Sequence, residues 1–383
     1  MKILAVGGGS GGHVTPVVAV LAEVKKFQKS AEIRFWCDYK FAPQAKSIMK
    51  NFDPKIPVHT IIAGKFRRYN HLSVLGHFFS PSLVLLNIRD IFLIIAGFVQ
   101  SFTKLIIWRP DVVFTKGGYV CLPVGIAARL LMIPLVIHDS DAHPGLTNRV
   151  LATWAKSIAT GAPLKYYSYS VNKSVYTGIP VSDDFHEFSD IERKDAKNLW
   201  KVDSKRPLIV ITGGGLGAQR MNDATAVVLD DLLHLGSVVL VSGAGQYDEL
   251  RSLVPPNSER FQLHSFVSKD MASLLGAADV VVTRAGATTI LELAALHKPT
   301  ILVPNGQLTG GHQLKNAAVY IEKDAVKVVD ESIMVDNPQI LVSAVREVLH
   351  DLSAASKMAE RFASFSRPDA ARDVADMIIS SAK

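Results

Sequence analysis

Short apolar runs alternate with stretches of helical periodicity along most of the chain. In the first part of the sequence the runs lie at Ile3–Val6, Ile33–Cys37, Val58–Ile62, Val112–Thr115, Leu135–His138 and Ser157–Thr160. The pattern resumes later with runs at Leu208–Thr212, Val238–Val241, Phe261–Phe266, Val280–Thr283 and Thr300–Val303. Strands that alternate with helices in this way predict parallel sheets covered by helices.

A break in the pattern divides the chain. Residues 161–186 hold scattered glycines and prolines and the run Tyr166–Ser170, and 383 residues suffice for about two domains. We therefore predict an α/β protein of two doubly wound, Rossmann-like domains that face one another across a cleft. The predicted domains are residues 1–163 and 164–367, and we expect a helix at about 368–383 to pack back on the first.

Each half opens with a strand, a glycine-rich loop and a helix. The first loop is Gly7–His13 and the second is Gly213–Ala218. A loop with few side chains lets backbone N–H groups approach an anion, and the helix start adds the positive end of its dipole. Both loops therefore predict phosphate sites. His13 lies at the mouth of the first, either as a general base or as a phosphate contact.

The first loop also fits a different class of enzyme. Gly7, Gly9 and Gly12 match the dinucleotide-binding fingerprint, and Asp38 follows the second strand. A nicotinamide-dependent oxidoreductase is thus an alternative, although such an enzyme would leave the second glycine loop without an evident function.

Three more polar clusters follow predicted strands. In Ala285–Glu292, Thr289 and Glu292 have the capping-box spacing, and Glu292 could equally accept hydrogen bonds from ribose hydroxyls. The stretch 310–316 combines glycine, imidazole and amide groups, which suit sugar hydroxyls, but it also suits a loop with a helix cap. His138–His143 holds two carboxylates and two imidazoles, which could bind a metal ion. We favour instead a carboxylate that orients a ligand or a neighbouring loop, because adjacent residues at a strand end point in different directions.

The most hydrophobic segment runs from Leu72 to Trp108. Pro81 and the pair Arg89–Asp90 interrupt it, so we do not expect a membrane-spanning helix. Cations flank the segment at Lys65, Arg67, Arg68, Lys104 and Arg109. An apolar face rimmed by cations suits an anionic bilayer surface, with ordinary core helices as the alternative. A peripheral membrane scaffold is accordingly a non-enzymatic alternative for the whole chain.

The charge and the cysteine content indicate the kind of partner and the cellular compartment. The net charge of +7 and the pI near 9.2 favour acidic partners, which include anionic lipid, nucleotide phosphates and nucleic acid. Cys37 and Cys121 lack metal or disulfide spacing, which suits a reducing compartment. The apolar run after Lys2 is too short for a secretory signal, so we expect a cytoplasmic protein.

Six motifs together, in their order along the chain, resemble the MurG family of bacterial glycosyltransferases, in glycosyltransferase family 28. They are Gly7–Pro16, Lys116–Pro123, His138–Asn148, Gly213–Ala218, Ala285–Glu292 and His312–Ala317. The resemblance spans roughly residues 1–350 and implies a glycosyltransferase of the B type. It implies that the chain adds N-acetylglucosamine to lipid I and so makes lipid II for peptidoglycan, with the acceptor in the first domain.

The resemblance also implies roles for individual residues. His13 corresponds to the catalytic base. The implied nucleotide-sugar contacts are Ser10, Gly11, Gly12, Asp141, Ser182, Gly215, Leu216, Phe266, Val267, Ala287, Thr288, Glu292, His312 and Gln313. The implied acceptor contacts are Gly9, Ser10, Gly118, Tyr119 and Asp141. Among the donor contacts, Glu292 would meet the ribose and His312 with Gln313 the sugar.

The implied substrates are UDP-N-acetylglucosamine and undecaprenyl-linked lipid I. No tightly bound cofactor, required metal or nucleic acid is implied. The implied partners are the anionic cytoplasmic face of the bacterial plasma membrane and cell-wall synthesis proteins. Three positions depart from the family pattern: Asp141 stands where many members have asparagine, Gly215 where serine is usual, and Ser182 where arginine is common. The change at position 182 removes one phosphate-directed cation.

Overall fold

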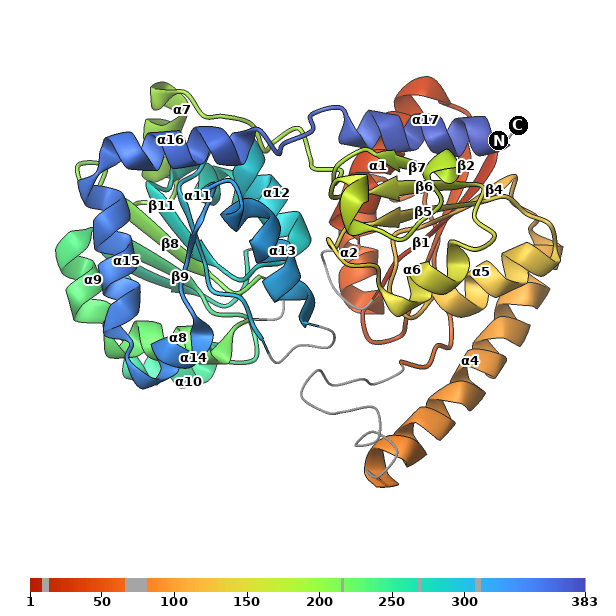
Figure 1. The fold of residues 1–383 in the computed structure, drawn as a ribbon, viewed down its shortest axis with the longest axis horizontal. Coiled ribbons are helices and arrows are strands. Elements are labelled where there is room, and N and C mark those ends of the chain that lie inside the picture. The colour runs from red at the N-terminus through yellow and green to blue at the C-terminus, as the bar shows by residue number, and fades with distance from the viewer. Residues whose placement is uncertain (9–13, 66–80, 215–216, 268–269, 307–310, 383) are drawn as a thin grey trace. The chain divides into compact units, whose positions relative to one another are not determined.

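The computed structural model divides the chain into two compact α/β units, each built on one parallel sheet (Figure 1). It describes residues 1–8, 14–65, 81–214, 217–267, 270–306 and 311–382. The first unit comprises Met1–Ser182, Gln307–His312 and Arg367–Lys383. The second comprises Asp183–Gly306 and Gln313–Ser366.

The sheet of the first unit has the strand order β3-β2-β1-β4-β5-β6-β7. Its strands are β1 (Lys2–Val6), β2 (Glu32–Cys37), β3 (Val58–Thr60), β4 (Val112–Thr115), β5 (Leu135–Asp139), β6 (Ser157–Thr160) and β7 (Ser174–Tyr176). Its helices are α1 (Thr15–Phe27), α2 (Ala42–Phe52), α4 (Pro81–Ile107), α5 (Cys121–Leu130), α6 (Leu146–Leu151) and α17 (Ala370–Ala382). Every residue of β4 and β5 is buried, as expected for central strands of a parallel sheet with both faces covered.

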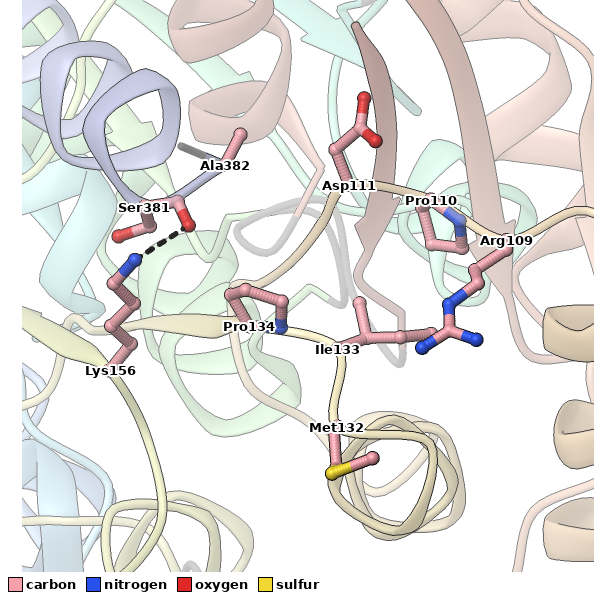
Figure 2. A pocket seen from close by; sticks show the side chains of 9 residues that line it. All are labelled: Arg109, Pro110, Asp111, Met132, Ile133, Pro134, Lys156, Ser381 and Ala382. Atoms are coloured by element: carbon pink, nitrogen blue, oxygen red, sulfur yellow. Dashed lines mark hydrogen bonds between the residues drawn. The ribbon is translucent and has the colours of Figure 1, made fainter.

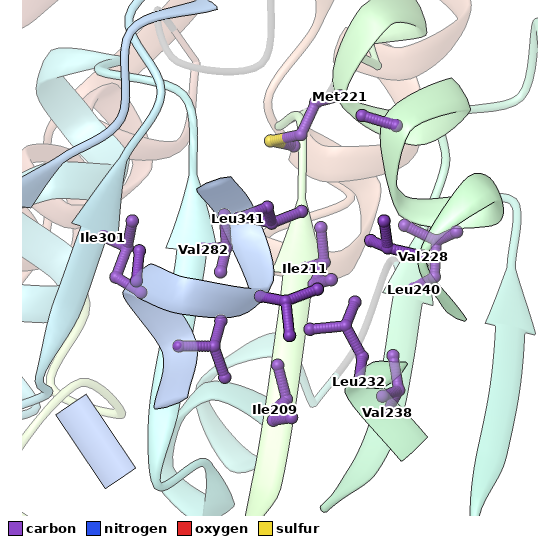
Figure 3. Packing of buried hydrophobic residues seen from close by; sticks show 14 of the residues in the cluster. Ile209, Ile211, Met221, Val228, Leu232, Val238, Leu240, Val282, Ile301 and Leu341 are labelled. Carbon is purple, nitrogen blue, oxygen red and sulfur yellow. The ribbon is translucent and has the colours of Figure 1, made fainter. Parts of the chain in front are cut away.

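The second unit repeats this plan with the strand order β10-β9-β8-β11-β12-β13. Its strands are β8 (Leu208–Thr212), β9 (Ser237–Val241), β10 (Phe261–His264), β11 (Val280–Thr283), β12 (Thr300–Leu302) and β13 (Lys327–Val328). Its helices are α7 (Asp190–Leu199), α8 (Gln219–Val227), α9 (Leu229–Leu235), α10 (Tyr247–Leu253), α11 (Met271–Ala277), α12 (Ala287–Ala295), α13 (His312–Ile321), α14 (Glu331–Asp336), α15 (Gln339–His350) and α16 (Leu352–Ala363). Aliphatic side chains from β8, β9 and β11 interlock with Leu341 of α15 in its core (Figure 3).

Both strand orders reverse direction between the first and fourth strands, β1 and β4 in one unit and β8 and β11 in the other. Ligands of such sheets bind at the carboxyl ends of the strands around that point. The predicted doubly wound α/β fold is confirmed, and every predicted apolar run corresponds to a strand.

The chain passes from the first unit to the second after Ser182. β7 pairs with β6 through Ile158 and Ser174, so the predicted boundary after residue 163 falls inside the first unit. Further along, α17 returns to this unit. Its buried Val374, Ala375 and Ile378 belong to the same core cluster as the inward face of α1.

Helix α4 runs without interruption from Pro81 to Ile107. The expectation that the pair Arg89–Asp90 would divide this segment is therefore wrong, whereas α4 begins at Pro81 and the part of the segment before it lies outside the described residues. A proline is tolerated in the first turn of a helix, and the buried Asp90 carboxylate accepts hydrogen bonds from the Arg89 guanidinium. Among the described residues, Leu83–Ile107 is the one helix long and apolar enough to cross a membrane, a test that core helices also pass.

Candidate functional site

In the first unit, the loops after β1 and β4 meet without intervening side chains. Gly117 and Gly118 have φ angles of +94° and +90°, in the region that favours glycine. A Cβ atom on Gly118 would lie 2.8 Å from the carbonyl oxygen of Gly8. The two loops can approach this closely only with glycine at position 118, and the approach brings backbone groups together at the carboxyl edge of the sheet.

Beside these loops, Asp38 is engaged by the protein itself. Its Oδ1 accepts hydrogen bonds from the backbone N–H groups of Lys40, at 3.0 Å, and Phe41, at 3.1 Å. The hydroxyl of Tyr119 also bonds to this carboxylate, and together with burial this raises the pKa of Tyr119. Asp38, the acidic residue of the oxidoreductase alternative, therefore fixes local structure, and the comparisons below do not support that alternative.

The loop after β5 rests on a group of buried polar residues. The ring of His138 donates from Nε2 to the carbonyl oxygen of Gly178 at 2.8 Å, and the Lys116 ammonium donates to Oγ of Ser140. Burial lowers the pKa of Lys116 to about 8 and raises the pKa of Asp139 to about 7. Asp141, a predicted contact, follows these residues directly and is partly exposed.

In the second unit, α12 begins at Ala287, with Gly286 as its N-cap and no side-chain cap. The predicted capping box of Thr289 and Glu292 is therefore wrong, because Thr289 already lies within the first turn of the helix. Ala287 and Thr288 open that turn after β11. Burial raises the pKa of Glu292 to about 7.

The other predicted residues of the second unit follow β10 and β12. Phe266 is exposed and Val267 partly exposed, both just after β10. His312 and Gln313 open α13, and Oε1 of Gln313 accepts a hydrogen bond from the backbone N–H of Asn305 at 2.8 Å. Gln313 thereby ties α13 to the loop after β12.

Some predicted site residues lie outside the described residues. They are Gly9, Ser10, Gly11, Gly12, His13, Gly215 and Leu216. Ser182 is exposed and is the last residue before the chain passes to the second unit. Within the described parts of the chain, no group of three or more His, Cys, Asp or Glu side chains is placed to hold a metal ion.

Three helices begin where these loops end. In α1, α8 and α12, which follow β1, β8 and β11, the N-cap residues Val14, Ala218 and Gly286 provide no side-chain cap. Backbone N–H groups at such helix starts have no intrahelical partner, and the helix dipole favours an anion beside them. The arrangement suits binding of phosphate groups at the carboxyl edge of each sheet.

Two surface cavities lie at the opposite, amino-terminal ends of strands in the first unit. One, of about 330 Å³, includes Arg109, Met132 and Lys156, and Nζ of Lys156 donates to the carbonyl oxygen of Ser381 at 3.0 Å (Figure 2). The other, of about 540 Å³, is lined by residues of the α1–β2 and α2–β3 connections. Neither cavity contains a predicted site residue.

Comparison with known proteins identifies the class. Residues 3–160 match the glycosyltransferase family 28 N-terminal domain, and residues 208–374 match the C-terminal domain of that family. The matched regions contain strands β1 to β6 of the first sheet and all of the second sheet, so the fold and its loops define a two-domain glycosyltransferase.

Relatives extend over nearly the whole chain. The UDP-N-acetylglucosamine–N-acetylmuramyl-(pentapeptide) pyrophosphoryl-undecaprenol N-acetylglucosamine transferase of Clostridium perfringens is 31% identical, over 91% of this chain and 90% of its own length. Its counterpart from Natranaerobius thermophilus is 32% identical over 99% of both chains. The chain therefore belongs to this family of N-acetylglucosamine transferases, the MurG family.

Solved structures agree with this assignment. The crystal structure of MurG from Acinetobacter baumannii has a TM-score of 0.69 and 25% identity, covering 99% of this chain and 100% of its own. A UDP-GlcNAc 2-epimerase from Neisseria meningitidis reaches the same TM-score, 0.69, at 13% identity over 99% of this chain and 100% of its own. At that identity the epimerase shows the shared fold alone.

Proposed function

We propose that this chain transfers N-acetylglucosamine from UDP-N-acetylglucosamine to the 4-hydroxyl of the muramyl sugar of undecaprenyl-diphosphate-linked lipid I. The transfer inverts the anomeric centre and forms lipid II for peptidoglycan. The main support is full-length similarity to transferases named for this reaction. Further support comes from the loops at the carboxyl edges of both sheets, where the matching motifs lie.

The second unit is proposed to hold the donor. Glu292 would accept hydrogen bonds from the two ribose hydroxyls, and Gly215 with Leu216 would contact the diphosphate. His312 and Gln313 would meet the sugar. The start of α8, whose N-cap Ala218 provides no side-chain cap, supports this assignment, because its N–H groups and dipole favour the negative charge that develops on UDP as it leaves.

The first unit is proposed to hold the acceptor, with Gly118, Tyr119 and Asp141 among its contacts. His13 would take the proton of the muramyl 4-hydroxyl as its oxygen attacks the anomeric carbon of the donor. The bond from that carbon to the β-phosphate oxygen breaks with its electron pair, and UDP departs. A well-placed base contributes about a hundredfold or more to such a step.

Helix α4 is proposed to bring the enzyme to the cytoplasmic face of the bacterial plasma membrane as a peripheral protein. One face of α4 packs on the core of the first unit through Phe98, Phe102 and Leu105. Large apolar side chains remain exposed on it at Leu85, Ile88, Ile91, Phe92, Ile95, Val99, Ile106 and Ile107. Lys65, Lys104 and Arg109 add cations at its flanks, which suits an anionic bilayer.

The decisive experiment is transfer from labelled UDP-N-acetylglucosamine to a short-chain lipid I analogue, with UDP-glucose as competing donor. We expect a disaccharide product from UDP-N-acetylglucosamine. Absence of product from protein that still binds UDP would reject lipid I as the acceptor. A His13→Ala variant measured alongside tests the base, since wild-type turnover by this variant would reject that role.

A further inference from the structure

The tyrosine-rich stretch after β6 reaches back to the loop after β5. The Tyr167 hydroxyl donates to the carbonyl oxygen of Asp141 at 2.8 Å and accepts a hydrogen bond from the backbone N–H of Ala162 at 3.2 Å. The Tyr169 hydroxyl donates to Oδ2 of Asp139 at 2.6 Å. Tyr169 therefore holds the last residue of β5 and Tyr167 holds the loop that follows it, one on each side of Ser140.

The two tyrosines also support one another. Their rings stack with centroids 5.6 Å apart and an interplanar angle of 18°, and the Tyr169 ring packs against the core cluster that contains Ile158 of β6. A stacked pair anchored in the core fixes the positions of both hydroxyls. The segment that carries them is thereby coupled to the loop after β5.

The loop connects β5 to α6, whose N-cap is Gly145. Asp139 pairs with Thr160 in the sheet, but Asp141 lies beyond the last paired residue of β5. Tyr167 holds the backbone carbonyl of Asp141, which fixes the backbone position from which the Asp141 side chain extends at the carboxyl edge of the sheet.

We propose that Tyr167 and Tyr169 are positioning residues for the acceptor, which hold the Asp139–Gly145 loop so that Asp141 meets the acceptor sugar. This inference rests on the proposed function, in which Asp141 contacts the acceptor. Neither tyrosine touches the reacting atoms, and both act through the loop. The resemblance implies both a donor and an acceptor contact for Asp141, and this proposal assigns it to the acceptor alone. Loss of either hydroxyl should therefore weaken use of the acceptor and spare the donor.

The pKa of Asp139 offers a second measurement, because it depends on the groups around this carboxylate. This carboxylate faces Lys116 at the end of β4, Asp141 in its own loop, Asn148 of α6 and Tyr169. Burial and Asp141 raise the pKa of Asp139, whereas the hydrogen bonds from Tyr169 and Asn148 and the charge of Lys116 lower it. Removing the Tyr169 hydroxyl should raise this pKa further, so Asp139 should become protonated, and lose its charge interaction with Lys116, at a higher pH.

The test uses Tyr167→Phe and Tyr169→Phe in the full chain, with Tyr176→Phe as the matched control. The Tyr176 ring lies 4.5 Å from the Arg367 guanidinium, a contact that phenylalanine keeps. Steady-state rates are measured while lipid I analogue and UDP-N-acetylglucosamine are varied in turn. We expect each loop variant to lose about fivefold or more in kcat/KM for the acceptor while the donor KM stays within about twofold. The control should match the wild type.

The outcomes separate this inference from the proposed function. A wild type that binds UDP but makes no disaccharide would reject the proposed function, and this inference with it. An active wild type whose two variants keep its acceptor kcat/KM would overturn the inference alone, as would equal losses for both substrates with a lowered melting temperature. In a plot of acceptor kcat/KM against pH, the fall at acid pH should move to higher pH in Tyr169→Phe but not in Tyr167→Phe. A fall that stays in place in Tyr169→Phe would also overturn the inference.

Discussion

Binding of UDP-N-acetylglucosamine should weaken as the pH falls through neutrality, and Glu292 should be the cause. Burial raises the pKa of this carboxyl to about 7, and its proposed role uses the carboxylate as acceptor for two ribose hydroxyls. About nine-tenths of the side chains are then ionised at about pH 8 and about one-tenth at about pH 6. The dissociation constant should therefore rise about tenfold from the higher to the lower pH, which is ~1.4 kcal/mol.

Isothermal titration calorimetry can test this directly. Titrations in two buffers of different ionisation enthalpy should show release of about half a proton per donor bound near neutral pH, because binding selects the ionised carboxyl. Glu292→Gln is the matched control: it should bind more weakly and with a dissociation constant that no longer follows pH. A wild-type constant that is equal at both pH values, or a Gln variant that keeps the wild-type slope, would refute the reasoning.

Three further variants test the packing and the membrane surface. Phe362→Ala removes a fully buried ring and should lower the free energy of unfolding by about 3–5 kcal/mol in urea denaturation, and a loss below about 1 kcal/mol would contradict this burial. Gly97→Ala should cost about 1–3 kcal/mol and lower the melting temperature, because its Cβ would collide with the carbonyl of Ile62; an unchanged melting temperature would disprove the close contact. Replacing exposed Phe92 and Ile95 with aspartate should weaken flotation with anionic liposomes by about tenfold or more, while transfer to a short-chain acceptor stays within about twofold. Undiminished flotation would place the membrane surface elsewhere.

The central strands could be predicted because a strand buried on both faces is a continuous apolar run. β4 and β8 show this directly, since every one of their residues is buried. The edge strands β7 and β13 give no such signal, because they are only three and two residues long and carry partly exposed or polar side chains. They form strands by pairing with β6 and β12, and this pairing is visible only in the folded chain.

Helix starts were harder to predict than strands. Thr289 and Glu292 have the capping-box spacing, yet α12 begins earlier, at Ala287, with Gly286 as its cap. A capping box does form at Ser189 and Glu192, where α7 opens the second unit. The same spacing occurs in both places, so the spacing alone does not fix where a helix begins.

Within the candidate site, glycines and polar residues at strand ends could be recognised from the sequence, whereas their partners could not. Tyr169 bonds to Asp139, thirty positions earlier in the chain, and Tyr119 bonds to Asp38 across a greater separation. Such pairs depend on which strands become neighbours in the sheet. Local pattern therefore indicates where a ligand binds, but the supporting contacts become visible only in the folded chain.

The return of α17 to the first unit has a consequence for how the protein is made. The core of that unit needs Val374, Ala375 and Ile378, which are synthesised only after the whole second unit, Asp183–Gly306 and Gln313–Ser366. During translation the second unit can therefore be complete while the first still lacks part of its core. The half that begins first on the ribosome is thus the half that finishes folding last.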